Sequence, residues 1–339
     1  MKTVLVTGCA GFIGFHYAYK LLKLKNFKVI GVDMINNYYD IKLKKDRLLI
    51  LQKSFSNKKF SFYKINITNF NSLKTIFKKN KIDYVINLAA QAGVRESLRV
   101  PERYLDYNVK GFLNILELSN LHNIKHLIYA STSSVYGLNK KLPFSVNDTT
   151  DHPQQFYAVT KKTNELMAHV WSGLYNMRIT GLRFFTVYGP FGRPDMALFR
   201  FTQNIIENKP IDLFNYGNHI RDFTYIDDIV QGIFLAMKNL PKGIKKNENL
   251  KSSNSYYKHR IYNLGCGNEV KLEKFIELIE KNLNIKALKN KLPMQKGDVY
   301  KTSADIKLSK KDLGYNPQTK VEVGIKNFVN WYKSYYKIK

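Results

Sequence analysis

The sequence predicts an α/β protein built on a doubly wound parallel sheet, with a smaller lobe in its second half. Three observations indicate this fold class. A short β-branched run at residues 3–7 ends at a glycine-rich turn and is followed by an amphipathic helical pattern over 17–25. Strand and helix patterns then alternate as far as about residue 180. From residue 181 the alternation weakens, and proline and glycine interrupt the chain.

Length and composition narrow the class of protein. The 339 residues suggest about two lobes, and 44% apolar with 14% aromatic residues argue against disorder. No uncharged apolar run of about 18 residues is present that could span a bilayer. Cys9 and Cys266 are the two cysteines, which is typical of a reducing compartment and forms no metal-ligand pattern. We therefore expect a cytoplasmic protein with no metal site.

The net charge of +29 raises the question of a polyanionic partner. Most of the excess is lysine in scattered pairs, and the abundance of Lys, Asn, Ile, Phe and Tyr is typical of an AT-rich genome. The ten arginines are distributed differently from the lysines, because eight of them fall within residues 95–103 and 178–221. Arginine grips phosphate and carboxylate groups through two hydrogen bonds at once. The charge pattern thus predicts a small acidic ligand, and neither nucleic acid nor a membrane surface as partner.

The first strand leads into Gly8-Cys9-Ala10-Gly11-Phe12-Ile13-Gly14. Glycines at this spacing let the backbone turn tightly and approach a pyrophosphate at the start of a helix, which predicts a dinucleotide site. The next strand, over 28–32, ends in Asp33, 19 residues after Gly14, where a carboxylate can hold ribose hydroxyls and repel the extra phosphate of NADP. NAD is therefore expected. Asp33 could instead be a turn or N-cap residue, since Asn36 and Asn37 follow it.

Further strand and helix patterns continue the alternation. Strands are predicted over 60–65, 84–88 and 126–130, with helices over 72–79 and 101–121. Ligands of such sheets lie at the carboxyl ends of the strands. Two of these ends carry Leu88-Ala89-Ala90 and Ser131-Thr132.

A catalytic constellation follows the strand at 126–130. The cluster Ser131-Thr132-Ser133-Ser134 precedes a predicted helix in which Tyr157 and Lys161 are four residues apart and so share one face. An ammonium group beside a phenol favours the phenolate, so Tyr157 could act as a base, with the Thr132 hydroxyl sharing the proton. The alternative is an ordinary surface pair, because the chain has 23 tyrosines.

The chain resembles the extended short-chain dehydrogenase/reductases, a Rossmann-fold family that epimerises, dehydrates or decarboxylates nucleotide sugars. The resemblance extends over nearly the whole chain. Besides the motifs above it includes Leu182-Arg183-Phe184-Phe185, Tyr188-Gly189-Pro190, Arg221-Asp222-Phe223-Thr224-Tyr225 and Tyr262-Asn263-Leu264-Gly265. It implies that Tyr157 takes a proton from a sugar hydroxyl while bound NAD oxidises the sugar. It also implies a role in polysaccharide biosynthesis.

The resemblance assigns the remaining cofactor contacts. They are the glycine loop with Ala10, Phe12 and Ile13, then Asp33, Asn36, Asn66, Ile67, Leu88, Ala89, Ala90, Tyr157 and Lys161. Asn66 departs from the family, which usually has Asp near the adenine. Its amide oxygen can still accept a hydrogen bond, so weaker retention of NAD is the expected consequence.

Residues after Thr132 distinguish branches of the family. The 4,6-dehydratases have Asp-Glu there and the UDP-glucuronate decarboxylases Ser-Glu, whereas this chain has Ser133-Ser134 without an acid. Dehydration needs a group that protonates the departing hydroxyl, so epimerisation is favoured. The segments 33–40, 91–95 and 189–197 are similar to the UDP-glucuronate 4-epimerases. Conversion of UDP-glucuronate to UDP-galacturonate is thus expected, with Thr132, Ser133 and Ser134 beside the catalytic Tyr157 and Lys161.

The same resemblance suggests a set of substrate contacts, which comprises Arg95, Thr186, Arg193, Arg200, Arg221, Gln295 and Asp298. Gln295 stands where UDP-glucose epimerases carry Arg, and Asp298 could be a simple turn residue after glycine. A 4-epimerase of a neutral UDP-hexose or N-acetylhexosamine is the alternative function. Two less favoured alternatives are a UDP-glucuronate decarboxylase and a non-catalytic NAD-binding protein. The second is disfavoured because such a protein would not need Thr132, Tyr157 and Lys161 together.

The sequence also suggests a division of the chain. Residues 1–180 would form the NAD-binding domain, to which 223–240 return, while 181–222 and 241–316 would form the substrate lobe and 317–339 a C-terminal helix. The segment 244–258 is polar and is expected to be an exposed loop. The resemblance implies a homodimer formed through the helices at 106–121 and 157–171.

Overall fold

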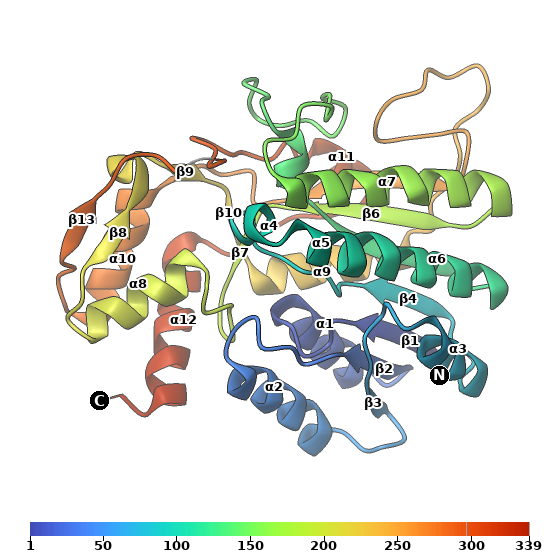
Figure 1. Ribbon diagram of the computed structural model, residues 1–339, viewed down its shortest axis with the longest axis horizontal. Coiled ribbons are helices and arrows are strands. Elements are labelled where there is room, and N and C mark those ends of the chain that lie inside the picture. The colour runs from blue at the N-terminus through green and yellow to red at the C-terminus, as the bar shows by residue number, and fades with distance from the viewer. Residues whose placement is uncertain (296, 339) are drawn as a thin grey trace.

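The fold is centred on a parallel sheet, seen in a computed structural model that describes residues 1–295 and 297–338 (Figure 1). The described residues form a seven-stranded sheet in the order β11-β6-β5-β4-β1-β2-β3. Every neighbouring pair in it runs parallel. Its strands are β1 (Lys2–Thr7), β2 (Phe27–Asp33), β3 (Phe60–Lys64), β4 (Tyr84–Asn87), β5 (His126–Thr132), β6 (Ile179–Phe184) and β11 (His259–Leu264). The predicted doubly wound α/β fold is confirmed.

Helices connect and cover these strands. In the first part of the chain they are α1 (Phe12–Lys23), α2 (Ile41–Ser54), α3 (Phe70–Lys79), α4 (Glu96–Arg99), α5 (Pro101–Tyr104), the π-helix η1 (Leu105–Lys110), α6 (Gly111–Leu121), the short η2 (Ser133–Tyr136) and α7 (Phe156–Tyr175). α1 begins at Phe12, earlier than the periodic pattern at 17–25 predicts, so its N-terminus lies directly at the glycine turn. The helix predicted over 101–121 contains a π segment at η1.

Side-chain alternation along the strands divides the core into two layers. In β1, Val4 and Val6 pack with α1, α2 and α9 (Ile226–Lys238) on one face. Leu5 points to the other face and packs with α3, α6 and α7. This alternation follows from the two-residue repeat of a strand, and it buries both faces of the sheet. The carboxyl ends of the strands are left free for a site.

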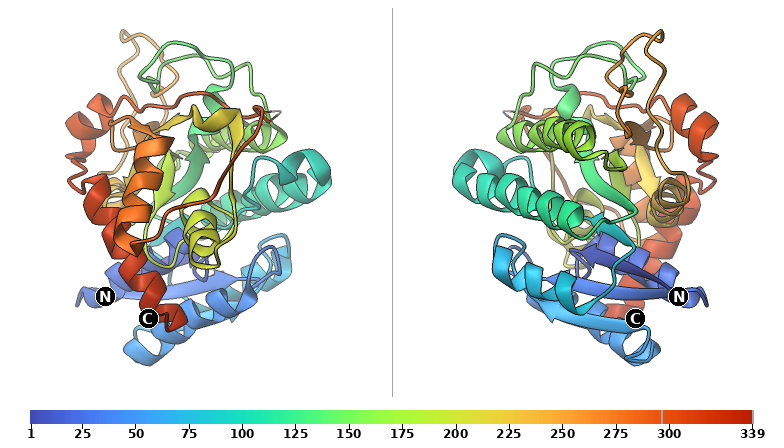
Figure 2. Two further views of the ribbon diagram at one scale, coloured as in Figure 1. Left: turned by 90° about the vertical axis from the view of Figure 1, so that its left-hand side faces the viewer. Right: turned by 90° about the vertical axis from the view of Figure 1, so that its right-hand side faces the viewer.

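The second half of the chain adds the lobe seen beside the sheet in Figure 1 and turned toward the viewer in the left panel of Figure 2. Its elements are β7 (Thr186–Tyr188), α8 (Ala197–Ile206), β8 (Ile211–Leu213), η3 (Phe214–Gly217), β9 (Ile220–Arg221), β10 (Phe223–Tyr225), β12 (Val270–Lys271), α10 (Leu272–Leu283), β13 (Lys289–Lys291) and α12 (Val321–Tyr336). α11 (Lys307–Leu313) instead packs on β11 and α9, beside the main sheet. Three two-stranded sheets join β10 to β7, β12 to β9 and β13 to β8. α12 packs on α10.

The predicted division of the chain needs one correction. The prediction places 181–184, 259–264 and 307–313 in the lobe, but the first two belong to β6 and β11, which pair with each other at the edge of the main sheet, and the third is α11, which packs on β11. The sequence pattern does not indicate that β11 joins the main sheet, because β11 follows the long polar segment and has no strand beside it in sequence. Lys339, the last residue of the predicted C-terminal segment, lies outside the described residues. The remaining boundaries stay predictions.

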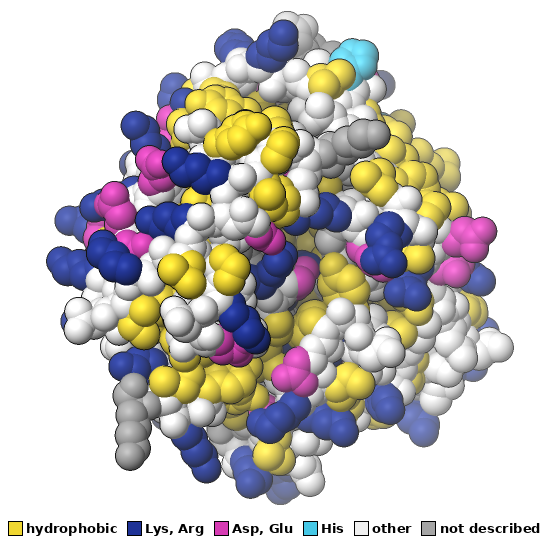
Figure 3. Space-filling model, turned by 60° about the vertical axis from the view of Figure 1, so that its left-hand side comes forward, with side chains coloured by type: hydrophobic (Ala, Val, Ile, Leu, Met, Phe, Trp, Pro, Cys, Tyr) yellow, Lys and Arg dark blue, Asp and Glu magenta, His cyan; other side chains and the backbone are white. Residues whose placement is uncertain are grey.

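Lysine and arginine side chains account for the large net charge. Figure 3 shows Lys and Arg side chains spread around the face that it draws. In the described part of the chain, no helix is long and apolar enough to cross a membrane. Residues 244–258 contain no helix or strand, and most of them are exposed, as expected for a loop.

Candidate active site

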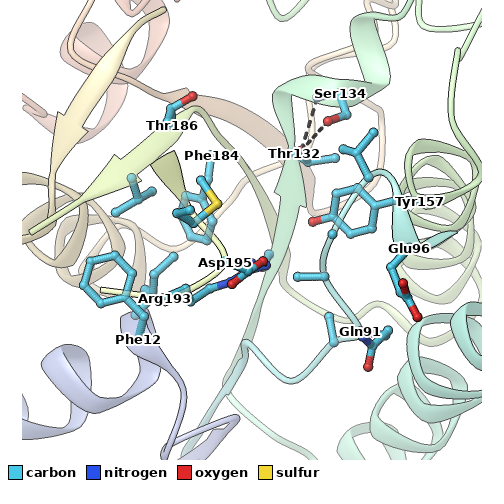
Figure 4. A pocket seen from close by; sticks show the side chains of 18 of the residues that line it. Phe12, Gln91, Glu96, Thr132, Ser134, Tyr157, Phe184, Thr186, Arg193 and Asp195 are labelled. Atoms are coloured by element: carbon cyan, nitrogen blue, oxygen red, sulfur yellow. Dashed lines mark hydrogen bonds and ion pairs between the residues drawn. The ribbon is translucent and has the colours of Figure 1, made fainter. Parts of the chain in front are cut away.

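A cavity of about 780 Å³ lies between the carboxyl ends of the sheet strands and the lobe. Figure 4 shows its centre, where Tyr157, Thr132 and Ser134 lie near Arg193 and Asp195. It brings together nearly all residues that the sequence singles out. Those that line it are Gly8, Gly11, Phe12, Ile13, Gly14, Asp33, Asn36, Asn66, Ile67, Leu88, Ala89, Ala90, Arg95, Thr132, Ser133, Ser134, Tyr157, Lys161, Thr186, Arg193, Arg200, Arg221 and Asp298. Ala10 and Gln295 are not in this lining.

The glycine loop leaves no space for side chains. A Cβ added to Gly14 would lie 2.0 Å from the Gly8 carbonyl oxygen, and one added to Gly8 would lie 2.8 Å from the Ala89 nitrogen. Gly8 also has a φ of +69°, in the left-handed region that favours glycine. The backbone therefore forms a tight cradle at the N-terminus of α1, where backbone N–H groups and the helix dipole favour a phosphate. This shape fits the pyrophosphate of a dinucleotide.

Asp33 stands at the end of β2 beside the glycine loop. Its carboxylate accepts hydrogen bonds from the backbone nitrogens of Ala10 at 3.1 Å and Ile35 at 2.8 Å. Burial raises the pKa of Asp33, while these bonds and the nearby Lys44 lower it. The Asp33 side chain is thus fixed against the loop. It both stabilises the turn and lines the cavity, two positions between which the sequence did not decide. Ala10 is buried behind the loop and contributes through its backbone.

The far end of the cofactor half is formed by Asn66 and Ile67. The Asn66 side-chain oxygen accepts a hydrogen bond from the Thr68 nitrogen at 3.0 Å, so it is already engaged in a turn. Its remaining lone pair can still accept a bond from a ligand, because a carbonyl oxygen has two. Asn36 likewise has its side-chain oxygen bonded, here by the Lys44 ammonium.

Tyr157 lies on the first turn of α7 and Thr132 at the end of β5. The Thr132 hydroxyl bonds both the side-chain oxygen and the backbone nitrogen of Ser134 at 3.2 Å. Burial raises the pKa of Tyr157 and is the dominant influence on it, while the positive charge of Arg193 and the nearby Thr132 hydroxyl act in the opposite direction. The hydroxyl group of Tyr157 therefore faces the groups that can stabilise its deprotonated form.

Lys161 bonds the strand next to its own helix. It follows Tyr157 by one helical turn, but its ammonium donates a hydrogen bond to the Ala130 carbonyl oxygen at 3.0 Å. Burial lowers the pKa of Lys161 to about 8, and Arg193 is the cation that acts on Tyr157. The helix spacing gives the right face, yet the buried ammonium satisfies itself on the neighbouring strand.

Arg193 and Asp195 form a charged pair at the centre of the cavity. The guanidinium bonds both carboxylate oxygens of Asp195, at 3.0 and 2.5 Å, and the Tyr38 hydroxyl donates to the same carboxylate at 3.4 Å. Although burial opposes it, the charge of Asp195 raises the pKa of Arg193. Tyr38 and Asp195 were not singled out from the sequence. An acid two residues after an arginine is a signal, but one too common to identify a site.

A second ion pair joins the two halves of the cavity rim. Arg95 bonds Asp298 at 3.2 Å and lies 4.8 Å from the centre of the Phe214 ring. Gln155 bonds the adjacent Gly297 carbonyl oxygen. Two predicted substrate contacts are therefore paired with each other. Gln295, outside the lining, has a buried side-chain oxygen without a hydrogen-bond partner among the described residues.

The remaining arginines lie on the lobe side. Burial lowers the pKa of Arg221 to about 10, with Asp298 opposing the shift, and its guanidinium bonds the Tyr300 carbonyl oxygen at 2.9 Å. Arg200 is exposed and, within the described part of the chain, makes no ion pair. Thr186 opens β7, and its backbone nitrogen bonds the Asp222 carbonyl oxygen. The lobe side of the cavity therefore contains one partly buried cation, Arg221, and one exposed cation, Arg200.

One residue that supports the cavity from outside its lining, Asn108, carries no signal in the sequence. Asn108, within the π-helix η1, donates to the Gln91 carbonyl oxygen and to Thr160 at 3.0 Å, and its own oxygen accepts from the Gln91 nitrogen at 2.7 Å. It thereby fixes the segment after Ala90. Arg183, which falls in an arginine-rich window, is instead fully buried and bonds Glu165 through two nitrogens at 2.8 Å.

Comparison with known proteins identifies the class of site. Residues 4–265 match the family model described as the NAD dependent epimerase/dehydratase family. This chain belongs to that family. The predicted membership and the predicted use of NAD are confirmed, and the protein is an NAD-dependent nucleotide-sugar epimerase by class. Within residues 1–295 and 297–338, no group of three or more His, Cys, Asp or Glu side chains is placed to hold a metal ion.

Individual members of the family cover the whole chain. Protein CapI of Staphylococcus aureus is 48% identical over 336 residues, which is 98% of this chain and 99% of that protein. UDP-glucuronate 4-epimerase 4 of Arabidopsis thaliana is 43% identical over 98% of this chain and 76% of its own. The structure of a Bacillus cereus UDP-glucuronic acid 4-epimerase in complex with UDP-glucuronic acid and NAD superposes with a TM-score of 0.87, at 33% identity, over 98% of this chain and 100% of that one.

Proposed function

We propose that this epimerase converts UDP-glucuronate to UDP-galacturonate through a transient 4-keto sugar. The observation that carries the proposal is the row of hydroxyl groups at the end of β5. Thr132, Ser133 and Ser134 line the cavity beside Tyr157, and no carboxyl group stands at the two positions after Thr132. Such a site can remove and return a proton at C4 but has no acid there to expel a hydroxyl group. The relatives named as UDP-glucuronate 4-epimerases support the same choice of sugar.

Tyr157 is the proposed acid and base. Its phenol takes the proton from the C4 hydroxyl as the sugar is oxidised and returns it when the sugar is reduced. Burial raises its pKa, and Arg193 and Thr132 oppose that rise; the positive nicotinamide of bound NAD would oppose it further. Lys161, bonded to the Ala130 carbonyl oxygen, places a second cation one helical turn away. Thr132 can share the proton because it also bonds Ser134.

The cofactor half would hold NAD through the glycine loop, with Asp33 at the ribose and Asn66 and Ile67 at the adenine. The shape of the loop supports this assignment, because Cβ atoms at Gly8 and Gly14 would collide with the Ala89 nitrogen and the Gly8 carbonyl oxygen and so force the tight turn open. Bound NAD supplies reversible two-electron oxidation at C4 of the sugar. The net redox change of the reaction is zero, so no second substrate is needed.

The substrate half would bind the UDP moiety and the sugar carboxylate. Arg193, Arg200 and Arg221 are the proposed diphosphate contacts, and Arg95 with Asp298 would close over the nucleoside. A 4-keto glucuronate is a β-keto acid, which loses CO₂ when its carboxylate bond stands perpendicular to the carbonyl plane. We propose that hydroxyl donors, Ser133, Ser134 and Thr186, hold the carboxylate near that plane and so oppose decarboxylation.

The test is a comparison of three substrates. Purified protein is incubated separately with UDP-glucuronate, UDP-glucose and UDP-N-acetylglucosamine, and the products are identified by proton NMR. The proposal expects UDP-galacturonate from the first and little conversion of the neutral sugars. Rapid conversion of a neutral sugar without conversion of UDP-glucuronate would show a neutral-hexose 4-epimerase instead. A UDP-pentose as the main product would show a decarboxylase.

We also propose that two copies of the chain pair through α6 and α7, which lie side by side in Figure 1. α7 exposes a row of apolar side chains, with Leu166 57%, Val170 46% and Leu174 69% exposed. Such a contiguous apolar face is typical of an interface. Light scattering after size exclusion tests this. A dimer is expected, and the double change L166E/V170E should give a monomer; a natural chain that is already monomeric contradicts the proposal.

A further inference from the structure

The turn that carries Arg193 is held by the cofactor half of the molecule. Three successive carbonyl oxygens precede Arg193, and each accepts a side-chain hydrogen bond. His16 of α1 donates to Pro190 at 2.8 Å, and Arg47 of α2 donates to Phe191 at 2.7 Å and to Gly192 at 3.2 Å. The turn thus belongs to the lobe in sequence, while its position is set by α1 and α2.

The same guanidinium reaches the glycine loop. The other terminal nitrogen of Arg47 bonds the Ala10 carbonyl oxygen at 2.9 Å and the Tyr39 hydroxyl at 2.7 Å. Arg47 is completely buried, and its Nε has no acceptor among the described residues. A buried cation with an unsatisfied donor destabilises a fold. Its planar fork nevertheless joins the two loops that form the opposite walls of the active site.

The conformation of the turn depends on these bonds. Gly189 has a φ of +145°. Phe191 has a φ of +55°, in the left-handed region that residues other than glycine rarely adopt. A strained residue of this kind persists only where its surroundings determine it. Here the centre of the Phe191 ring lies 5.1 Å from that of the Phe15 ring and 4.9 Å from that of the Trp331 ring. The backbone bonds from Arg47 supply the second constraint.

We propose that Arg47 is a positioning residue, which fixes Arg193 relative to the glycine loop and so sets the affinity for the diphosphate of the substrate. The inference rests on the proposed function in one respect, the contact between Arg193 and the UDP moiety. Arg47 itself does not line the cavity. Its effect on ligand binding must therefore pass through the groups that it bonds, which are the turn, the glycine loop and Tyr39, and a cycle with Arg193 isolates the part carried by the turn.

The test is a double-mutant cycle on the NAD-loaded protein with UDP as the probe, measured by titration calorimetry. Arg47→Lys keeps the charge but loses the fork that serves four acceptors. We expect it to weaken UDP binding about tenfold, and to weaken it less than about twofold when Arg193→Met is already present, because residues that act through one another are not additive. Equal losses in both backgrounds, or unchanged affinity in the natural background, would overturn the proposal.

A matched control separates positioning from general loosening of the core. Arg183→Lys alters another fully buried arginine, which bonds Glu165 and the Val146 carbonyl oxygen. It should lower the melting temperature and leave UDP affinity within about twofold. If Arg47→Lys does not fold, His16→Phe removes only the bond to Pro190, and a smaller loss of UDP affinity that again vanishes beside Arg193→Met is expected. No such loss would contradict the proposal.

The probe keeps this inference separate from the proposed function. UDP carries no sugar, so its affinity reports on the turn whether or not UDP-glucuronate is converted. Non-additive losses in a protein that does not epimerise UDP-glucuronate would retain the positioning role and refute the substrate. Additive losses in an active epimerase would do the reverse.

Discussion

The two walls of the active site are built from different materials. The cofactor wall is mostly backbone, a glycine loop within seven consecutive residues that has no room for a Cβ at Gly8 or Gly14. The substrate wall is made of long charged side chains from distant segments. Two of its cations are already paired with acids of the same chain, Arg193 with Asp195 and Arg95 with Asp298.

This difference has consequences for binding. A rigid backbone cradle is complementary to its ligand before binding, so little ordering is needed when the ligand arrives. On the substrate wall an incoming diphosphate must join or displace the carboxylates that already neutralise the arginines. The Arg95 side chain is 49% exposed in its pair with Asp298, so this pair is screened by salt, whereas the fit of the cradle is set by backbone shape. We therefore expect substrate affinity to respond to salt and single charge changes, and cofactor retention to respond to steric changes.

The largest effect should come from the group between the two walls. Tyr157→Phe removes the phenol that exchanges the C4 proton, so kcat should fall by about 10²–10⁴-fold. NAD content, measured after denaturation, should not change. Tyr175→Phe is the control, because Tyr175 lies on the same helix and is 48% exposed. A Tyr157→Phe protein with a near-normal rate would refute the proposed base.

A steric change should break the cofactor wall. Gly14→Ala places a Cβ 2.0 Å from the Gly8 carbonyl oxygen, so the loop must open. NAD content of the purified protein should fall at least about tenfold, a loss of about 1.4 kcal/mol or more in binding. Gly314→Ala is the control, since it meets nothing within 4 Å and carries only the strain of its φ of +71°, about 1–2 kcal/mol of stability. Retention of NAD in the Gly14 variant would contradict the cradle.

A charge change on the substrate wall should alter the pH profile. The positive charge of Arg193 lowers the pKa of Tyr157, so Arg193→Met should raise that pKa. Less of the tyrosine is then deprotonated at a given pH, and the rising limb of kcat/KM moves to higher pH. Arg200→Met removes a cation from the same cavity that does not act on Tyr157. It should weaken binding without moving the limb; equal shifts in both variants would be evidence against the assignment.

The smallest effect is expected at the rim. The Arg95 side chain is 49% exposed in its pair with Asp298, and pairs of this kind contribute about 0.2–1 kcal/mol. Arg95→Gln should therefore raise KM about two- to fivefold and reduce its dependence on salt. Arg99→Gln breaks a surface pair with Glu96 and should leave KM unchanged. A loss much larger than tenfold at Arg95 would mean that the rim binds more tightly than this account allows.

The two walls also differ in how well the sequence predicts them. The glycine loop, Asp33 and the Tyr157–Lys161 spacing could be read from the sequence because each depends on residues close together in one strand, turn or helix. The partner of each charge could not. The ammonium of Lys161 bonds Ala130 and not Tyr157, and Arg95 finds Asp298 some two hundred positions away. α2 was also missed, because buried Lys44 and Arg47 interrupt its apolar pattern.

The central claim is that C4 of a UDP-uronate is oxidised and reduced again within one site. Incubation with UDP-glucuronate carrying deuterium at C4, followed by proton NMR, tests it most directly. The account predicts UDP-galacturonate that retains the deuterium at C4, because the hydrogen removed from that carbon returns to it on the opposite face. Loss of the deuterium to solvent, or release of a UDP-pentose in place of UDP-galacturonate, would contradict it.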